Sequence, residues 1–320
     1  MSVLVYTESE KGKFKKIALE VASYAKAVAD QMGTTVTAIT VNADDVSELG
    51  TYGVDKVLKV NDGKLDMFNA KTYANIIKQA AEKEGSKVVV VSQSADSKYL
   101  APILAVNLHA GYASNVVEAP TSASPFTVKR TAFTNKAFNF TTIDTDVKIV
   151  GVSNNSFGLK ENSGSASAED FSPSIPENGV HVDSVDRASN KVSIADADIV
   201  VSAGRGLKGP ENWGIIEDLA EVLGAATACS KPVSDLGWRP HGEHVGQTGK
   251  PVASNLYIAI GISGAIQHLA GINASKVKVV INSDPEAPFF KAADYGVVGD
   301  AFDVVPRLTE KLKEFKAQNA

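Results

Sequence analysis

Four glycine-punctuated segments in the last third of the chain carry the residue types best suited to hold an anionic ligand. They are Gly204-Arg205-Gly206-Leu207-Lys208, Gly246-Gln247-Thr248-Gly249-Lys250, Gly261–His268 and Asn282–Pro288. Each lies just after a predicted strand or just before a predicted helix, where an α/β fold offers backbone N–H groups to an anion. Few acidic, basic or nucleophilic groups accompany them. The pattern therefore predicts a site that binds a ligand rather than one that cleaves it.

The first segment is a glycine-rich turn between a predicted strand, Ile199–Ser202, and a helix. Glycine allows a tight backbone path and a close approach of the ligand. The planar guanidinium of Arg205 matches the geometry of a phosphate group. An ordinary loop with a solvated arginine explains the same residues, because glycine-rich turns are common.

The second segment resembles the end of a phosphate-binding loop. The full G-x-x-x-x-G-K-[ST] pattern is absent, since Pro251 follows Lys250 and cannot supply the hydroxyl that binds magnesium. A nucleoside triphosphatase is therefore disfavoured. The segment is either a β-turn or a source of donors, from Gln247 and Thr248, to the edge of a planar ring.

The third segment gives the strongest phosphate signal in the chain. A predicted strand, Leu256–Ile260, runs straight into a helix expected to begin near Ser263. The first N–H groups of that helix have no internal partners, and its dipole favours an anion. His268 is expected about one and a half turns into the helix, where a lone histidine is more often structural than functional.

The fourth segment is a rigid turn, since Asp284-Pro285 and Ala287-Pro288 restrict its backbone. Alone it indicates nothing beyond a turn. We expect all four loops at the carboxyl ends of strands in one sheet, the edge at which open α/β sheets bind ligands. Their shared position favours one common site.

Alternating strand and helix patterns predict two α/β domains. In the first half, strand, helix, strand, strand, helix, strand, helix are expected over Val3–Tyr6, Phe14–Met32, Val36–Val41, Lys56–Val60, Thr72–Lys83, Val88–Val91 and Tyr99–Leu108. This rhythm is typical of a doubly wound sheet. The second half repeats it over Ile199–Ser202, Trp213–Leu223, Leu256–Ile260, Gly264–Ala270, Val277–Ile281 and Val304–Lys316.

The stretch between the two rhythms has a different character. Phe126–Arg130, Phe138–Thr142 and Val147–Val152 are short and alternating, which predicts antiparallel strands added to the sheet edge. Residues 154–178 are rich in Ser, Asn, Gly, Pro and Glu and are interpreted as a surface linker. We place the domain boundary near residue 187, with an N-terminal domain over 1–186 and a C-terminal domain over 187–320.

Composition narrows the class of protein. A net charge of −5 over 320 residues argues against a nucleic-acid binder, whose footprint is a basic patch. No segment approaches the roughly 20 apolar residues that span a bilayer, so no membrane insertion is expected. The single cysteine, Cys229, fits a reducing compartment. With no charged or apolar leader before Val3–Tyr6, a cytoplasmic protein is expected.

The remaining chemical groups suggest no catalysis. His241 and His244 bracket Gly242-Glu243, but without further ligands nearby they are interpreted as solvent-facing loop histidines and no metal site is predicted. Cys229 is interpreted as a small buried residue. Neither G-x-S-x-G nor H-E-x-x-H occurs, so a hydrolase has no support.

Taken in order, the motifs Gly204–Lys208, Val245–Lys250, Leu256–His268, Asn282–Pro288 and Ala293–Gly296 closely resemble the electron transfer flavoprotein alpha subunit family. The resemblance is dense over residues 199–310 and looser before them. It implies a Rossmann-like C-terminal domain that binds one FAD, and an N-terminal domain that forms the interface with a beta subunit. It implies an electron carrier rather than an enzyme, serving fatty acid β-oxidation. Electrons would pass from flavin dehydrogenases, such as acyl-CoA dehydrogenases, to a membrane quinone oxidoreductase.

The resemblance also assigns cofactor-binding residues. Arg205 is expected near the flavin and its phosphates, Thr248 near flavin N5, and His268 near the O2 side. The full set implied by the family is Arg205, Ser230, Lys231, Val245, Gly246, Gln247, Thr248, Ser263, Gly264, Ala265, Ile266, Gln267, His268, Asn282, Asp300 and Ala301. Asn282, Asp300 and Ala301 are expected to hold the adenosine half.

One position departs from the family pattern, because Lys231 stands where an arginine is common. A lysine is a point charge on a flexible stem and cannot stack flat on the flavin ring as a guanidinium does. We therefore expect the one-electron-reduced flavin to be less stabilised than with arginine.

Three alternatives remain open at this point. A subunit of an electron-bifurcating complex shares the same motifs. A plain nucleotide-binding module would use the N-terminal domain, which lacks a glycine-rich loop after Val3–Tyr6. An NAD-dependent dehydrogenase would need G-x-G-x-x-G after the first strand, which is not evident.

Overall fold

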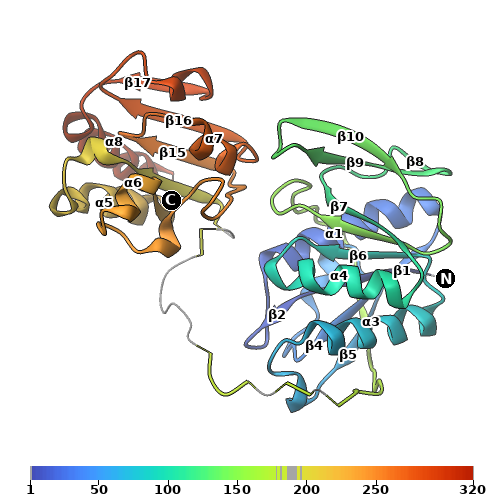
Figure 1. Cartoon of the computed structure of the whole chain (residues 1–320). Helices are drawn as coiled ribbons and strands as arrows, with labels where there is room; N and C mark the ends of the chain where they lie inside the picture. The colour runs from blue at the N-terminus through green and yellow to red at the C-terminus, as the bar shows by residue number, and fades with distance from the viewer. Residues whose placement is uncertain (1, 178, 181, 186–192, 195–196, 320) are drawn as a thin grey trace. The chain divides into compact units, whose positions relative to one another are not determined.

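The structure, a computed structural model, describes residues 2–177, 179–180, 182–185, 193–194 and 197–319. It divides into two compact units, shown in Figure 1. Unit 1 comprises residues 1–133 and 137–186, and unit 2 comprises residues 134–136 and 187–320. The domain boundary predicted near residue 187 lies outside the described residues. Each unit is an α/β fold.

Unit 1 is built on one large sheet. Its strands are β1 (Ser2–Tyr6), β4 (Thr35–Val41), β5 (Lys56–Val60), β6 (Val88–Ser92), β7 (Gly111–Val116), β8 (Ser122–Ala123), β9 (Phe126–Ala132), β10 (Ala137–Thr142), β11 (Lys148–Val152) and β12 (Ser167–Asp170). A separate hairpin joins β2 (Ser9–Glu10) and β3 (Lys13–Phe14). The helices are α1 (Lys16–Met32), α2 (Glu48–Thr51), α3 (Ala70–Glu84) and α4 (Ala95–Asn107), with a 3-10 turn, η1 (Gly63–Leu65).

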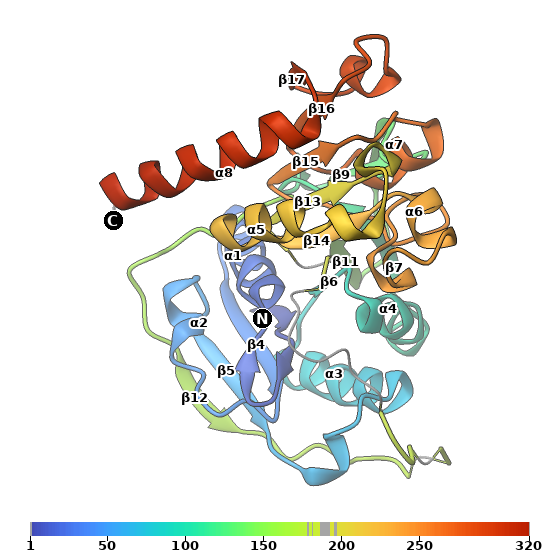
Figure 2. The same cartoon turned by 90° about the vertical axis from the view of Figure 1, so that its left-hand side faces the viewer.

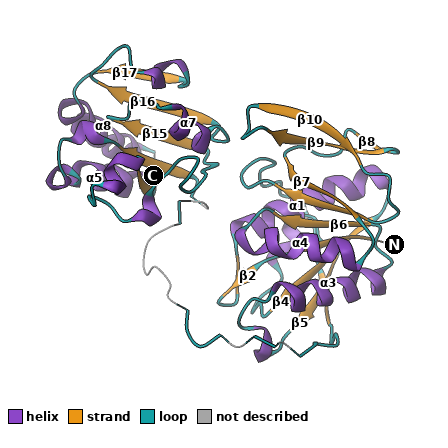
Figure 3. Cartoon of the chain, in the orientation of Figure 1, coloured by secondary structure: helices purple, strands orange, loops and turns teal. Residues whose placement is uncertain are grey.

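The sheet order in unit 1 is β10-β9-β7-β11-β6-β1-β4-β5-β12, with β8 paired to β9. The pairs from β7 through to β12 are parallel, and β9 and β10 extend the edge as antiparallel strands. Strand residues alternate between two apolar cores, as Val3 and Val5 pack with α1 while Leu4 and Tyr6 pack with α3 and α4. Figure 3 shows helices covering both faces of the sheet. This is the doubly wound arrangement predicted from the sequence.

The helices of unit 1 end where local chemistry stops them. Gly33 and Gly85 adopt the left-handed conformation after α1 and α3, which a residue without Cβ does at little cost. Asn69 caps α3 by accepting backbone N–H bonds from Lys71 and Thr72. Ser94 caps α4, so that helix begins at residue 95, four residues before the predicted start.

Two predictions for unit 1 are wrong. The strand predicted over 147–152 as an antiparallel edge strand is β11, which lies between β6 and β7 and pairs with both in parallel. Its Ile149, Val150 and Val152 are fully buried. A continuous apolar run is the signature of a buried parallel strand, and it outweighs the apparent alternation.

The segment over 154–178 is not a linker in its described part. The Glu20 carboxylate on α1 accepts backbone N–H bonds from Asn155, Phe157 and Gly158, each at 2.8 Å. Further on, β12 pairs in parallel with β5 at the far edge of the sheet. Polar composition misled the prediction because this segment is held through its backbone rather than through apolar side chains.

Unit 2 is a smaller doubly wound fold. Its strands are β13 (Ile199–Ala203), β14 (Ala226–Cys229), β15 (Leu256–Ile260), β16 (Val277–Asn282) and β17 (Tyr295–Val298). Its α-helices are α5 (Gly214–Leu223), α6 (Lys231–Asp235), α7 (Ile266–Ile272) and α8 (Ala301–Gln318). Short 3-10 turns are η2 (Arg205–Leu207), η3 (Pro210–Asn212), η4 (His241–Glu243) and η5 (Pro288–Lys291).

All strands of unit 2 are parallel, in the order β14-β13-β15-β16-β17. The chain leaves β13 toward β14 and then returns to place β15 on the other side, so the order reverses between β13 and β15. Ligands of such sheets bind where this reversal leaves a crevice at the carboxyl edge. Helices α5 and α8 pack together on one face, as Figure 2 shows, around Trp213, Ile216 and Val305.

Within the described part of the chain, none of the helices combines the length and apolar character that a bilayer crossing requires.

Candidate functional site

Two glycine loops meet at the strand reversal of unit 2. Gly204 follows β13 and Gly261 follows β15. The Gly206 N–H donates to the Gly261 carbonyl at 3.1 Å. A Cβ on Gly206 would lie 2.6 Å from Gly261 Cα, so the two backbones touch. Gly261 has a φ of +59°, which an L-residue with a side chain rarely adopts. Glycine is required here by both space and conformation.

A cavity of about 680 Å³ opens at this carboxyl edge. Its size lies within the range of about 300–1,000 Å³ typical of small-molecule and cofactor sites. The lining residues come from all four predicted loops and from α6. They are Arg205, Ser230, Lys231, Pro232, Asp235, His244, Val245, Gly246, Gln247, Thr248, Gly261, Ile262, Ser263, Ala265, Gln267, His268, Asn282, Asp284 and Ala287.

The structure brings twelve of the sixteen predicted cofactor residues to this one cavity. The other four, Gly264, Ile266, Asp300 and Ala301, are not part of its lining. Gly264 has a φ of +87° and is pressed against the backbone of Phe289. Asp300 caps α8 by accepting the Phe302 N–H at 2.9 Å. The structure thus gives Gly264 and Asp300 a local structural role, and their contact with a cofactor stays a prediction.

The loop around Gln247 is placed differently from the prediction. It does not follow a strand of the sheet. Instead the Val245 N–H donates to the Cys229 carbonyl at the end of β14, at 3.0 Å. The Gln247 N–H donates to the Gln267 carbonyl in α7, at 2.8 Å. These two bonds fix the loop between β14 and α7 at the same carboxyl edge as the other three.

The helix predicted to begin near Ser263 begins three residues later. Helix α7 spans Ile266–Ile272, and His268 lies in its first turn rather than one and a half turns in. Ser263 and Ala265 therefore line the cavity from the non-helical segment before α7, in which Ala265 has a ψ of 144°. Because the helix has only seven residues, its dipole contributes less than the sequence suggested.

His268 is buried and held by a tyrosine. The Tyr257 hydroxyl lies 2.9 Å from His268 Nε2, and the imidazole is 6% exposed. Burial, together with the nearby His244, lowers the pKa of His268 to about 4, and the Val245 backbone opposes the shift. The ring is therefore neutral near pH 7, and it stiffens the cavity wall.

Asn282 ties two loops together. Its Nδ2 donates to the Ile262 carbonyl at 3.0 Å, and its Oδ1 accepts the Asp284 N–H at 3.0 Å. The loop after β16 is thereby fastened to the loop after β15. The predicted cofactor residue thus has a structural role in the cavity whatever it contacts.

Charges of both signs line the cavity. Lys231 Nζ lies 3.1 Å from Asp235 Oδ1, so these two exposed charges are paired. Arg205 is exposed and makes no ion pair among the residues that the structure describes. Its guanidinium is available to an anionic group.

Sequence reasoning missed several lining residues. His244 was predicted to face solvent, but it is 2% exposed and lies in the cavity wall. His241 is exposed, as predicted. The signal for His244 was its place directly before Val245 and Gly246. Pro232, Asp235, Gly261, Ile262, Asp284 and Ala287 also line the cavity and lie beside or within the quoted motifs.

Cys229 is the small buried residue that the sequence predicts. Cys229 is fully buried, and burial raises the pKa of its thiol to about 12. Among the described residues, no three side chains of His, Cys, Asp or Glu gather as a metal site would require.

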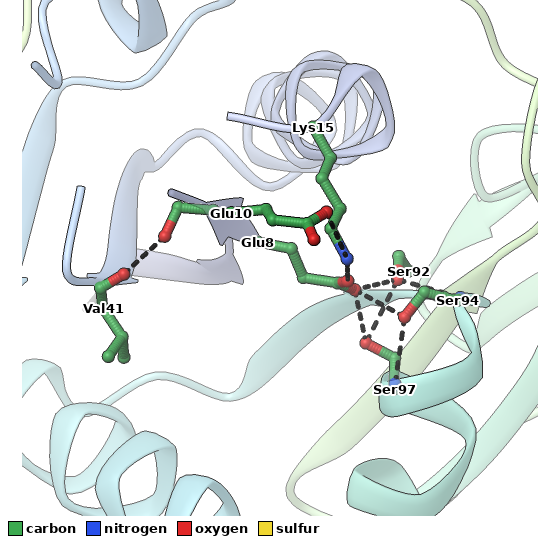
Figure 4. A network of polar contacts seen from close by, with 8 residues as sticks. Glu8, Glu10, Lys15, Val41, Ser92, Ser94 and Ser97 are labelled. Atoms are coloured by element: carbon green, nitrogen blue, oxygen red, sulfur yellow. Dashed lines mark hydrogen bonds and ion pairs between the residues drawn. The ribbon is translucent and has the colours of Figure 1, made fainter. Parts of the chain in front are cut away.

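The corresponding edge of unit 1 carries a compact polar cluster, shown in Figure 4. Glu8, just after β1, is 3% exposed. Its Oε1 accepts hydrogen bonds from the hydroxyls of Ser92, Ser94 and Ser97, the last two at 2.8 Å. Lys15 Nζ lies 3.7 Å from its Oε2. The carboxylate occupies the strand reversal between β1 and β6.

The chain is thus a two-unit α/β protein with a cavity at the strand reversal of its second unit. Comparison with known proteins identifies its class. Residues 3–175 match the family described as Electron transfer flavoprotein domain. Residues 193–273 match the Electron transfer flavoprotein FAD-binding domain. Unit 2 therefore contains an FAD-binding domain.

Relatives of nearly equal length agree. The chain is 37% identical to electron transfer flavoprotein subunit alpha of Bacillus subtilis, covering 98% of this chain and 97% of the relative. It is 34% identical to the subunit alpha of Thermoanaerobacterium thermosaccharolyticum, covering 98% of each chain. It is 35% identical to that of Pseudomonas aeruginosa, covering 98% of this chain and 100% of the relative. The chain belongs to the electron transfer flavoprotein alpha subunit family.

Proposed function

We propose that the chain holds FAD in the cavity of unit 2 and carries electrons as one subunit of a flavoprotein heterodimer. The observation that supports this most is the convergence of four separate loops on one cavity at the strand reversal of a parallel sheet. The FAD-binding family match covers the first three of these loops. FAD, once bound, accepts and releases electrons without bond-making on a substrate.

The residues present fit such a cofactor. Gly204, Gly206 and Gly261 keep side chains out of the crevice, which permits close approach of a ligand to the backbone. Arg205 supplies a positive charge suited to pyrophosphate.

Each wall of the cavity has a distinct task. Arg205 and the backbone of residues 263–265 bind the anionic part. Gln247 and Thr248, exposed at the tip of their loop, orient the ring through their donors and acceptors. Buried apolar groups, Ile262 and Ala287, exclude water from the inner wall. Asn282, Asp300 and Ala301 are proposed to hold the adenosine half.

The electronic role falls to positive charge near the ring. Lys231 is the first residue of α6 and Ser230 precedes it, both in the cavity lining. A cation near the ring favours a reduced, negatively charged flavin, and Lys231 provides one in place of a stacking guanidinium. No group needs to act as a catalytic acid or base, since the protein binds, orients and tunes the cofactor.

We further propose a beta subunit as the partner, bound through unit 1, because the relatives are named subunit alpha. The electron donors are flavin dehydrogenases such as acyl-CoA dehydrogenases, and the acceptor is a membrane quinone oxidoreductase. The single cysteine fits a cytoplasmic setting. The comparisons do not favour the bifurcating alternative.

The test is the visible spectrum of the chain purified with its beta subunit. We expect a yellow complex with one FAD, which bleaches when an acyl-CoA dehydrogenase and its substrate are added. Arg205→Ala is expected to lower FAD affinity by about 10- to 100-fold, since a charge-assisted bond contributes about 1.5–3 kcal/mol. Full retention of FAD by Arg205→Ala would count against the site.

A further inference from the structure

His244 stands apart from the residues assigned to the cofactor, yet it is one of the most buried polar side chains of the cavity wall. It is 2% exposed, and its Nδ1 has no hydrogen-bond partner in the described part of the chain. His241, three residues earlier, is exposed, with its ring centroid 5.4 Å away. The proposed electron transfer requires no buried imidazole besides His268, so the burial of His244 needs its own explanation.

The backbone on either side of His244 forms a closed loop. The His244 carbonyl accepts the Lys250 N–H at 2.9 Å. Within that loop, the Gly249 N–H donates to the Gly246 carbonyl at 3.1 Å. Gln247 and Thr248 form the exposed tip. The loop therefore has a fixed base, and its tip faces the cavity.

The imidazole of His244 fills the inside of this loop. A Cβ on Gly249 would lie 2.9 Å from both Cγ and Nδ1 of the ring. A Cβ on Gly246 would lie 3.4 Å from Nε2. Both glycines thus pack directly against the ring, which leaves no room for the loop to settle further inward.

We propose that His244 is a positioning residue: its neutral imidazole supports the loop from within and so sets where Gln247 and Thr248 meet the cofactor. This rests on the proposed function, in which that cofactor is FAD bound in the cavity. A smaller side chain would leave a void under the loop and let the tip move.

Because the His244 imidazole can take up a proton, its support of the loop depends on pH. The groups that face His244 are His241 on η4, His268 on α7, and the paired Lys231 and Asp235 on α6. Burial, then His241 and Lys231, lower the pKa of His244, and only Asp235 opposes them. Protonating the ring places a charge in a buried position near the Lys231 ammonium, and opening the loop relieves it.

The direction of the pH dependence follows from the lowered pKa of His244. A free imidazole titrates at about 6.5, so above that pH the ring is neutral in both open and closed loops and closure is unaffected. As the pH falls below about 6.5, the open loop binds the proton more readily, and the closed loop is progressively lost. FAD affinity is therefore expected to weaken with acidification in this range.

The experiment measures FAD affinity of the full chain in complex with its beta subunit, at pH 7.5 and pH 5.5. His244→Phe keeps a ring but cannot take a proton, and His244→Ala removes the support. His241→Phe is the matched control, because His241 is exposed and lies on the same segment. Circular dichroism establishes that each variant is folded.

We expect the wild type to lose about fivefold to tenfold in affinity between the two pH values. His241→Phe should keep most of that loss, because burial is the first cause of the lowered His244 pKa and His241 only the second. His244→Phe should bind within about threefold of the wild type at pH 7.5 and lose most of that pH dependence. His244→Ala should bind at least about tenfold more weakly at both pH values, with a shifted flavin absorbance band because the tip residues have moved.

Equal affinity and spectrum in His244→Ala and the wild type would overturn the inference while leaving the proposed function intact. So would an unchanged pH dependence in His244→Phe, which decides the matter even where the alanine variant fails to fold. A wild-type complex without FAD would overturn both the inference and the proposed function.

Discussion

In both units the strand order of the sheet reverses, but the carboxyl edge at that point is filled in unit 1 and open in unit 2. In unit 1 the strand order reverses between β1 and β6, and the buried carboxylate of Glu8 fills that place with three serine hydroxyls around it. In unit 2 the order reverses between β13 and β15, and glycine loops leave a cavity of about 680 Å³. We call the edge in unit 1 that Glu8 fills the occupied edge, and the edge in unit 2 that borders the cavity the open edge.

The difference shows how little of a binding site the fold alone determines. Topology supplies the crevice and the helix N-terminus that attracts negative charge. In unit 1 the chain brings its own anion, Glu8, to the N-terminal turn of α4, where Ser94 and Ser97 meet it. In unit 2, Gly204 and Gly261 have no side chains to fill the crevice, so it stays available to a ligand. The two edges therefore differ in the side chains that follow their strands.

The largest effect is expected from closing the open edge. Gly261→Ala should destabilise unit 2 by about 3–4 kcal/mol, because the residue has a left-handed φ and its Cβ would meet Gly206 at 2.8 Å. FAD binding should fall with it. Urea unfolding followed by Trp fluorescence measures the loss. The matched control is Gly224→Ala, which has a φ of +65° with open space around its Cβ and should cost only about 1 kcal/mol.

Acid should affect the open edge next. His268 has a pKa of about 4 in the folded chain against 6.5 for the free imidazole. The unfolded chain therefore binds the proton first, and stability is lost as the pH falls from about 6.5 to about 4. The full loss is about 3 kcal/mol for this residue. Unfolding of unit 2 measured against pH should flatten in His268→Phe, and an unchanged slope would contradict the assignment.

Removing the Glu8 carboxylate from the occupied edge should reduce the unfolding free energy of unit 1 by less than the two changes above reduce that of unit 2. Glu8→Ala removes the acceptor of three hydroxyls, but it removes the buried charge as well, so we expect a loss of about 2 kcal/mol. FAD affinity should not change. Glu10→Ala is the control, because Glu10 is exposed and approaches the same Lys15 at 4.0 Å. A loss of less than about 0.5 kcal/mol in Glu8→Ala would show that the cluster is not stabilising.

The smallest effect concerns tuning at the rim of the open edge. Lys231→Arg should raise the stability of the one-electron-reduced flavin by about 0.5 kcal/mol, since exposed charges contribute about 0–1 kcal/mol. This corresponds to roughly 20 mV in a one-electron potential. A redox titration of both proteins measures it. Identical potentials would mean that the guanidinium gains nothing over the ammonium at this position.

Much of the open edge could be predicted from sequence, because it depends on local signals. Glycines after apolar runs marked the loops at Gly204 and Gly261, and parallel topology placed them together. The start of α7 was missed because nothing in Ser263-Gly264-Ala265 distinguishes an extended entry from a first helical turn. His244 was misjudged because its burial comes from its own loop closing through Lys250, which no periodicity reveals.

The occupied edge could not be predicted at all. Glu8 lies 84 residues from Ser92 and 89 from Ser97 in sequence. An acidic residue after a strand is usually solvated, and only the tertiary structure shows that serines surround it. The segment over 154–178 was missed for a similar reason, since its anchor, Glu20, lies on the distant helix α1.

The loops of the open edge are joined to one another mainly through backbone atoms. Gly206 is bonded to Gly261 and Gln247 to Gln267, and the side chain of Asn282 reaches the Ile262 carbonyl. The side chains at the loop tips, those of Arg205, Gln247 and Thr248, make none of these connections. The scaffold is thus preorganised before any cofactor arrives, and it is encoded separately from the groups that set redox behaviour. Substitutions at the tips can therefore alter the potential of a bound flavin while the pocket keeps its shape. The electronic properties of the site can vary independently of its geometry.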